Sequence, residues 1–236
     1  MNEDTDSIEV TGMPRFINDA KILMHEMQSL TLSEGKVLWK CNDKLAELNY
    51  KRYQNMALMR RLTPAVIAYE GLQYQHMAPK VLTTRALSYL SEHLRILSGF
   101  YGVLKPFDGV TPYRLEMQAK LSVNDCRDLY DFWGERLYHS LVDDDRIIIN
   151  LASKEYSKCI ENYITPRDQF ITIEFGELVE GKVKQKGTIS KMARGDMVRF
   201  LAENNISDLS GLKDFRGKGF TYSKELSSNS KYVFLM

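Results

Sequence analysis

Apolar residues recur at helical spacing through much of the first half of the chain. Within residues 16–30 they return every three or four positions, which predicts an amphipathic helix. Ser33 is a candidate N-cap for a second helix, and Asn42 or Asp43 for a third, because their short polar side chains can accept from the first free N–H groups. The N-terminal part is therefore predicted to be mostly helical.

Three further stretches carry apolar runs of different lengths. Residues 65–69 fit either a strand or a helical turn, and Gly71 ends the run. A helix opened by Thr83 or Thr84 is predicted to continue to Leu97. Residues 125–141 also have helical spacing. Helices thus extend past the middle of the chain.

The second half adds strands. Ile147 to Ile149 is a short β-branched run, as expected of a central buried strand. Residues 170–175 alternate between apolar and polar positions, and Gly181 marks a turn into a partner strand at Val183. A helix over 190–204 and a last hairpin from 220–222 and 232–234 complete the pattern. Because helices and strands are interleaved without a regular βαβ rhythm, we predict a mixed α/β (α+β) fold, a single domain over residues 1–236 with a mixed sheet surrounded by helices.

Composition narrows the functional classes. The chain has 236 residues, 44% of them hydrophobic, with 32 Lys and Arg against 31 Asp and Glu. A nearly neutral chain needs a local basic patch to bind nucleic acid. The three cysteines have no CxxC spacing, which predicts reduced thiols and no zinc site. No apolar run has the roughly 20 residues of a membrane span, and the acidic start is not a signal peptide.

A glycine run with nearby cations is the first candidate site. Gly99 and Gly102 are three apart, after a predicted helix, with the basic side chains of His93, Arg95 and Lys105 around them. A hairpin between two helices can turn backbone N–H groups towards one phosphate, and glycine lets the backbone come close. The alternative, which the residues alone favour, is a tight structural turn. The familiar helix-hairpin-helix spacing has glycines two apart, and Pro106 would cut a second helix short.

A basic helix face is the second candidate. Lys191, Arg194 and Arg199 span an arc of about 140° at roughly 100° per residue. They fit a phosphate-binding surface, or simply the solvated face of an amphipathic helix. Gly195 within that helix costs roughly 1 kcal/mol against alanine, which hints at close approach by another backbone or a ligand.

Charged side chains elsewhere leave further alternatives open. Arg114 and Glu116 are two apart, so in an extended segment they point the same way and form either an anion-orienting pair or a structural salt bridge. Asn150 and residues 153–155 follow the apolar strand at 147–149, where ligands often collect in α/β folds, although Ser153 could equally be an ordinary helix N-cap with Glu155 nearby. The four histidines have no spacing that would bind a metal, so we expect no metal and no cofactor.

Several distinctive runs in one order resemble the YaaA peroxide-stress family. The resemblance runs from about Asp4 to about Phe234. The runs are Asp43 to Asn49, Ala68 to Tyr74, Glu92 to Asp108, Tyr113 to Met117, Asn150 to Tyr156, Lys191 to Gly195 and Glu225 to Ser228.

The resemblance implies a cytosolic protein of the hydrogen peroxide response, linked to lowering free intracellular iron. It also implies a mixed α/β fold with a helix-hairpin-helix element and a positively charged cleft that binds DNA. No enzymatic reaction is securely attached to the family.

The family resemblance also shows one departure at the N-terminus. Family members look as if they begin with a short hydrophobic strand followed by Ser-Pro-Ala-Lys, and neither precedes Met1 here. We therefore expect a form extended upstream by that segment to be more stable and to bind DNA better.

Three classes of function follow from these features. The first is a monomeric protein that binds duplex or distorted DNA through its phosphates, largely independent of sequence, using His93, Arg95, Gly99, Gly102, Lys105, Arg114, Lys191, Arg194 and Arg199. The second is an enzyme acting on a nucleotide or nucleic acid, with Glu116 or Glu155 as general acid or base. The third is a partner protein with no ligand of its own. Convergence of the cations favours the first class, a carboxylate buried among them favours the second, and dispersed charges favour the third.

Overall fold

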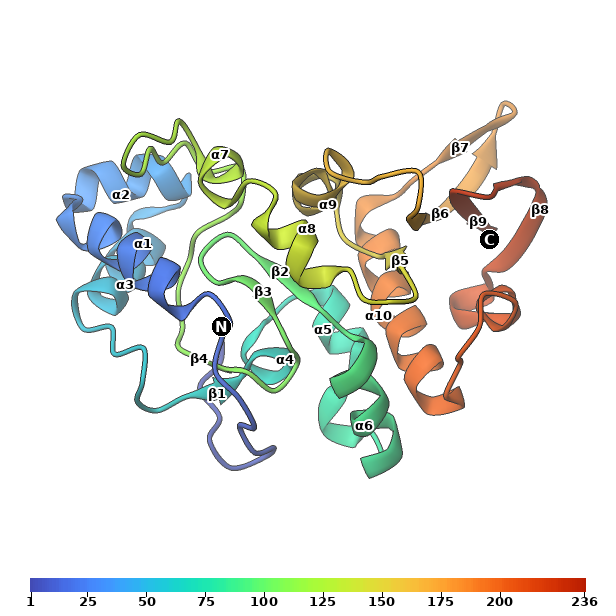
Figure 1. The fold of residues 1–236 in the computed structure, drawn as a ribbon, viewed down its shortest axis with the longest axis horizontal. Coiled ribbons are helices and arrows are strands. Elements are labelled where there is room, and N and C mark those ends of the chain that lie inside the picture. Colours follow the sequence, from blue (N-terminus) through green and yellow to red (C-terminus); the bar gives the residue numbers. More distant parts are fainter. The chain divides into compact units, whose positions relative to one another are not determined.

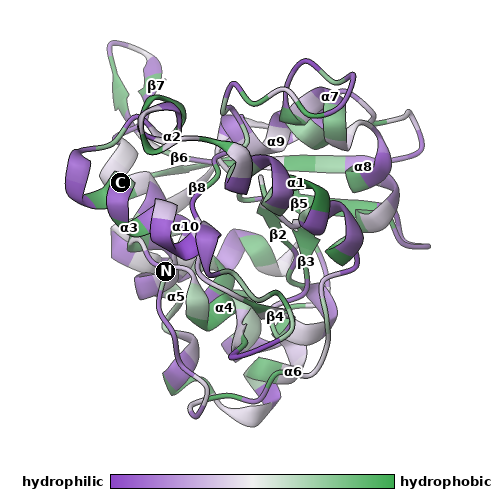
Figure 2. Ribbon diagram, turned by 90° about the vertical axis from the view of Figure 1, so that its left-hand side faces the viewer, coloured by the Kyte–Doolittle hydropathy of each residue, from purple (hydrophilic) through white to green (hydrophobic).

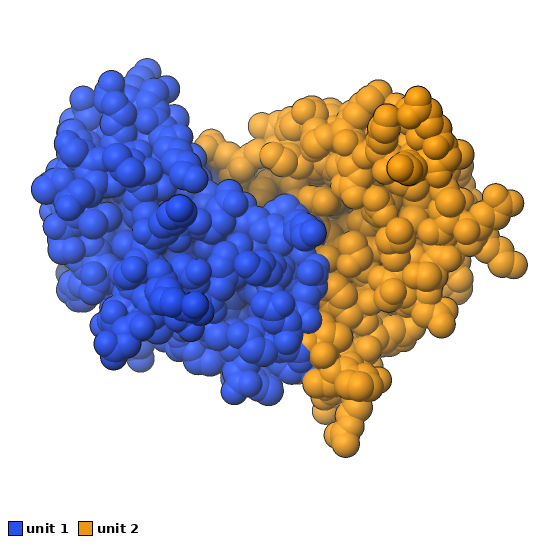
Figure 3. Space-filling model, turned by 90° about the horizontal axis from the view of Figure 1, so that it is seen from above, with its two compact units in different colours: residues 1–68, 95–141, 152–163 blue, residues 69–94, 142–151, 164–236 orange.

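The computed structural model describes residues 1–236 and contains two compact units. Unit 1 comprises residues 1–68, 95–141 and 152–163, and unit 2 comprises residues 69–94, 142–151 and 164–236 (Figure 3). Neither unit is one continuous stretch of chain. The expectation of a single domain over 1–236 stays a prediction.

Unit 1 is mainly helical (Figure 1). Its helices are α1 (Ile17–Ser29), α2 (Leu32–Trp39), α3 (Asp43–Gln54), α4 (Ala65–Ala68), α7 (Leu129–Trp133), α8 (Arg136–Leu141) and α9 (Lys154–Glu161). Its strands are β1 (Thr63–Pro64), β2 (Ile96–Ser98), β3 (Gly102–Leu104) and β4 (Gly109–Val110), which pair antiparallel as β1–β4 and β2–β3. The run at 65–69 is therefore a helical turn directly after a short strand.

Local capping explains where the early helices begin. Thr31, not Ser33, is the N-cap of α2, where it forms a capping box with Glu34. Asn42 caps α3 by accepting from the N–H of Leu45, as expected. The predicted helix over 125–141 is two short helices, because Gly134 adopts a φ of 51° and ends α7.

Aromatic rings form the centre of unit 1. Phe100 is fully buried, stacks on Tyr113 with ring centroids 5.0 Å apart, and meets Tyr53 edge-on. Trp133 is also fully buried and donates from its indole N–H to the carbonyl of Gly99 over 3.0 Å. This core fixes the segment that carries the predicted glycine run.

Unit 2 contains the mixed sheet. Its strands are β5 (Ile147–Asn150), β6 (Gln169–Val179), β7 (Lys182–Lys184), β8 (Thr221–Ser228) and β9 (Lys231–Leu235), in the order β5-β6-β9-β8 with β7 paired to β6. The β5–β6 and β6–β9 pairs are parallel, and the β6–β7 and β8–β9 pairs are antiparallel. The helices are α5 (Leu72–Met77), α6 (Thr84–His93) and α10 (Gly187–Asn204), with 3-10 turns η1 (Pro79–Val81), η2 (Gly211–Asp214) and η3 (Gly217–Gly219). The predicted mixed α/β fold and both predicted hairpins are confirmed.

One strand lies elsewhere than expected. β5 pairs with β6 alone and stands at the end of the sheet, so it is not the predicted central strand. The side chain of Ile147 at its start is exposed accordingly. A short apolar run shows that a strand is favoured, but not how many neighbours it has.

The hydrophobic core of unit 2 lies between the sheet and α10. Ile171, Ile173 and Phe175 alternate along β6 on the face that packs against Ala193 and Met197 of α10. Figure 2 shows hydrophobic and hydrophilic residues alternating along the helices, as expected when one side of each is buried. No helix in the structure is both long and apolar enough to cross a membrane.

Candidate phosphate-binding site

The basic face of α10 carries one partly buried cation that no carboxylate of the protein pairs with. Lys191 is exposed, and Arg199 pairs with Glu203 one turn later, Nε to Oε1, at 2.9 Å. Arg194 between them has no ion pair, and its Nε is buried without a hydrogen-bond partner. Burial lowers the pKa of the Arg194 guanidinium below its usual value. The three predicted cations of this helix are thus unequal in their surroundings.

α10 owes its position to the glycine that follows Arg194. A Cβ atom on Gly195 would lie 2.1 Å from the carbonyl oxygen of Gln73 in α5. The expected close approach by another backbone is therefore confirmed. On the same helix, Oδ1 of Asp196 is hydrogen-bonded to Nδ1 of His76, at a distance of 2.9 Å.

The His76–Asp196 pair was not among the predicted site residues. Both side chains are about four-fifths buried, and Oδ2 of Asp196 is buried without a partner. The two residues are 120 positions apart, so no sequence spacing indicates the pair. By contrast, His93 lies exposed in the last turn of α6, with its ring centroid 4.3 Å from that of Tyr89.

The glycine run joins two strands, which corrects the expectation of two helices around it. α6 ends at His93, and Gly99 to Tyr101 form the turn between β2 and β3. The backbone N–H groups of Phe100 and Tyr101 both donate to Oγ of Ser98, at 3.1 and 2.8 Å. Two N–H groups of the turn are thus engaged within the protein and its residues are buried, which favours the interpretation as a structural turn.

Arg95 and Lys105 share a buried carboxylate. Asp108 is 5% exposed, and its Oδ2 accepts from the backbone N–H of Lys105 at 2.8 Å. Burial raises the pKa of Asp108, while that hydrogen bond and the charges of Lys105 and Arg95 act in the opposite direction. The two cations therefore already face a negative charge in unit 1.

The raised pKa of Asp108 predicts a pH-dependent effect of Asp108→Asn. The folded protein holds this proton more tightly than the unfolded chain, so the wild type gains stability from the group as the pH falls through the raised pKa towards the usual value of about 3.9. The variant cannot gain in this way. Its stability relative to wild type should therefore be highest near pH 7 and should decline towards pH 4.

Urea unfolding of both proteins across that pH range measures the difference. Strain or an unpaired amide N–H on the new asparagine side chain changes the stability of the variant by the same amount at every pH. The decisive quantity is therefore how the difference in free energy of unfolding between variant and wild type changes with pH. Asp144→Asn, at an exposed carboxylate, is the matched control. A relative stability that rises towards acid pH would show that burial does not dominate at Asp108.

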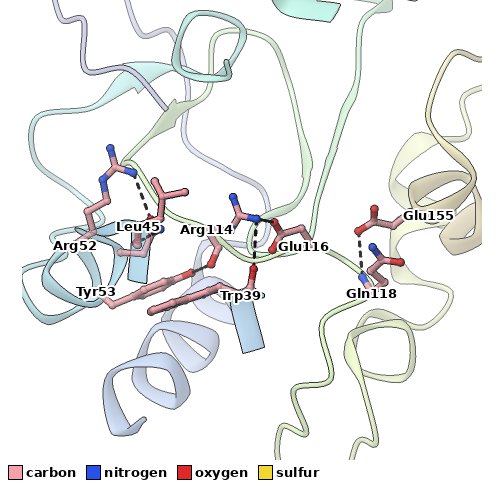
Figure 4. Close-up of polar contacts among 9 residues, drawn as sticks. Trp39, Leu45, Arg52, Tyr53, Arg114, Glu116, Gln118 and Glu155 are labelled. Carbon is pink, nitrogen blue, oxygen red and sulfur yellow. Dashed lines mark hydrogen bonds and ion pairs between the residues drawn. The ribbon is translucent and has the colours of Figure 1, made fainter. Parts of the chain in front are cut away.

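The Arg114–Glu116 pair is a salt bridge, as one of the two interpretations predicted. Nη2 of Arg114 lies 2.6 Å from Oε1 of Glu116 and 3.4 Å from the carbonyl oxygen of Trp39 (Figure 4). The hydroxyl of Tyr53 donates to the carbonyl of Arg114 at 3.1 Å. Both charged side chains remain about one-third exposed. The arrangement holds Arg114 in place beside a negative charge.

Glu155, the other candidate acid or base, lies in the first turn of α9. Its Oε1 accepts from the backbone N–H of Gln118 at 3.3 Å (Figure 4), and its carbonyl accepts from the hydroxyl of Tyr130 at 2.9 Å. Burial, with smaller contributions from nearby negative groups, raises the pKa of Tyr130 to about 12. Glu155 thus links the 114–118 segment to α9 within unit 1.

The predicted site residues fall into both units. Arg95, Gly99, Gly102, Lys105, Arg114, Glu116 and Glu155 belong to unit 1, whereas His93, Lys191, Arg194 and Arg199 belong to unit 2. Within unit 1 the structure brings together Arg114 with Glu116, and Arg95 with Lys105. Convergence of the whole set remains a prediction.

No disulfide joins the three cysteines, and no group of three or more His, Cys, Asp or Glu side chains is placed to hold a metal ion. Cys159 is buried, and burial raises its pKa to about 12, so the thiol stays protonated.

Comparison with known proteins gives the family. The family model described as "Peroxide stress protein YaaA" matches residues 1–226. A UPF0246 protein of Agathobacter rectalis is 54% identical over 231 residues, covering 98% of this chain and 93% of the relative. UPF0246 proteins of Pediococcus pentosaceus and Lachnoclostridium phytofermentans are 50% and 51% identical over 235 residues, covering all of this chain and 94% and 92% of the relatives. The chain therefore belongs to the YaaA family of peroxide stress proteins.

Proposed function

We propose that this protein acts in the cytoplasm during hydrogen peroxide stress by binding DNA through its phosphates, with Arg194 and Lys191 of α10 as the principal contacts. Membership of the peroxide stress family supports the setting. The unneutralised guanidinium of Arg194 is the observation that carries the binding site.

Burying the guanidinium of Arg194 lowers the stability of the protein when no anion is bound. Enclosing a cation without a carboxylate costs desolvation free energy that no internal partner returns. An anion held by Arg194 would supply the missing charge, and a guanidinium suits phosphate because it can donate two parallel hydrogen bonds. Lys191 lies one turn earlier, about 60° away around the helix, so both can face one strand of nucleic acid.

Contacts of this kind recognise backbone charge and not bases. Affinity for duplex DNA should therefore fall steeply with salt, with a slope of about −0.9 per phosphate contact, and should differ little between unrelated sequences. Salt-independent binding would contradict the proposal.

The substitution Arg194→Met separates function from stability. Methionine keeps an unbranched stem but removes the charge, so DNA affinity and the salt slope should both fall. The free energy of unfolding should stay the same or rise, because a poorly solvated cation is lost. Fluorescence anisotropy with a duplex and urea unfolding measure the two effects.

Arg199→Gln is the control on the same helix, since Glu203 already neutralises Arg199. It should change DNA affinity much less than Arg194→Met. If Arg194→Met lowers stability and leaves DNA binding intact, Arg194 is a structural residue and the proposed site is wrong.

We also propose that the protein lowers free intracellular iron, and that it does so in the cell as a consequence of binding DNA. Cells that carry Arg194→Met should then contain more free iron after peroxide treatment than cells with the wild type. Electron paramagnetic resonance of whole cells measures this pool. Equal iron levels in the two strains would separate iron control from DNA binding.

A further inference from the structure

Unit 2 has a second group of cations outside α10. Residues 213–218, here called the 213–218 turn, contain Lys213, Arg216 and Lys218 against one carboxylate, Asp214. The whole chain has a formal net charge of only +1. These six residues, which overlap η2 and η3, therefore carry a local formal charge of +2, three cations less one carboxylate.

No carboxylate of the protein pairs with these three cations, unlike others in unit 2. Lys186 pairs with Glu177 at 2.7 Å, and Lys231 pairs with Glu174 at 3.3 Å. The ammonium of Lys213 instead lies 5.5 and 5.4 Å from two ring centroids, those of Tyr222 and Tyr232. It keeps its charge there, because an aromatic face attracts a cation without neutralising it.

Arg216 and Lys218 are available to solvent. Nη1 of Arg216 donates to the carbonyls of Lys213 and Phe215 at 2.7 and 2.8 Å, which orients the guanidinium and leaves its charge unbalanced. Lys218 is exposed and adopts a φ of 54°, between Gly217 and Gly219.

The turn is held rigidly on the core. The ring of Phe215 is 1% exposed and meets Phe175 and Phe234 edge-on. A Cβ on Gly217 would lie 2.4 Å from that ring and 3.4 Å from Cβ of Asp196 in α10. A fixed turn loses little conformational entropy when it binds, which favours recognition of a partner.

Three cations close together in sequence suit a polyanion. Lys213, Arg216 and Lys218 lie within six residues, and a nucleic-acid strand presents one phosphate charge after another along its backbone. The apolar residues of the turn and its neighbours, Leu212, Phe215 and Phe220, are buried, so no apolar side chain is offered to a lipid bilayer.

From these observations we propose that the 213–218 turn is a second contact for the nucleic-acid backbone. It is separate from Arg194, because Asp196, which the turn touches, lies about 160° from Arg194 around α10. The inference rests on the proposed function for the identity of the partner, but not on the α10 contact.

The test is Lys218→Gly. Glycine adopts a φ of 54° without strain, so the variant should fold and be at least as stable as wild type. Loss of one phosphate contact should reduce the slope of log K against log salt by about 0.9 and weaken DNA binding at every sequence tested. Adding Lys213→Gln should reduce the slope by about as much again.

Lys40→Gly is the matched control. Lys40 is also an exposed lysine with a positive φ, 46°, so the same substitution removes the same charge from unit 1. It should leave the salt slope of DNA binding unchanged. Equal effects of the two substitutions would mean that net charge alone matters, and would overturn the proposal.

The outcomes also separate the two contacts. A lower slope for Lys218→Gly with no effect of Arg194→Met supports the turn and rejects the α10 contact, while the reverse rejects the turn alone. A wild type that binds no DNA rejects both. If anionic lipid vesicles or inorganic polyphosphate compete as well as DNA of equal phosphate concentration, the turn recognises phosphate in general and nucleic acid is not its partner.

Discussion

Replacing Gly195 with alanine should lower the free energy of unfolding of this protein by about 2–4 kcal/mol. The new methyl carbon would stand 2.1 Å from the carbonyl oxygen of Gln73 and 2.9 Å from Cβ of His76. Alanine favours a helix over glycine by roughly 1 kcal/mol, but that gain is smaller than the strain of moving two packed helices apart. Separation of α5 from α10 would also stretch the 2.9 Å hydrogen bond between His76 and Asp196.

Gly187→Ala is the control, because the same helix then receives the same methyl group in open space. No atom lies within 4 Å of a Cβ at Gly187, so stability should be unchanged or rise by up to about 1 kcal/mol. Urea unfolding of the two variants gives the comparison. If Gly195→Ala is as stable as Gly187→Ala, α5 does not pack against α10 at this position.

Local patterns predicted those elements whose partners are near in sequence. The alternation at 170–175 and the turn at Gly181 gave the β6–β7 hairpin, and the polar run before Tyr232 gave the β8–β9 hairpin. The caps of α3 and α6, Asn42 and Thr83, were each predicted as one of two adjacent candidates, because capping depends on residues within three positions. In each case the determining contacts lie within a short segment.

Elements governed by distant contacts were predicted less well. Leu94 to Leu97 continue the apolar spacing of α6, yet Ile96 and Leu97 belong to β2 because they pair with β3. Tertiary pairing outweighs helical propensity over so few residues. The position of β5 at the sheet edge likewise depends on strand order, which cannot be predicted from the residues of β5 alone.

In the candidate site, too, features set by neighbouring residues could be predicted and features set by distant contacts could not. Charge on one face of α10 and the Arg114–Glu116 pair could be predicted, because helical and extended geometry fix which side chains are neighbours. The sequence could not predict that Arg199 pairs with Glu203 while Arg194 has no ion pair, because burial of each side chain depends on how α10 packs in the folded unit. The His76–Asp196 pair joins two helices far apart in sequence and has no local pattern at all.

Gly99→Ala should separate the two interpretations of the glycine run. A Cβ at Gly99 would lie 2.5 Å from the carbonyl oxygen of Leu115 and 3.0 Å from the backbone of Glu116 and Met117. Since this neighbour is backbone and not a flexible side chain, the clash should cost about 3 kcal/mol of stability. It should also displace the segment that carries Arg114 and Glu116.

If Gly99 instead served to admit a phosphate, the variant would keep its stability and lose DNA affinity. Gly187→Ala is the comparison, because no atom lies within 4 Å of a Cβ there. It should leave stability unchanged or raise it slightly. A loss of stability at Gly99 but not at Gly187, measured by urea unfolding, would show that close backbone packing selects glycine at position 99, whereas wild-type stability with weakened DNA binding would restore the phosphate interpretation.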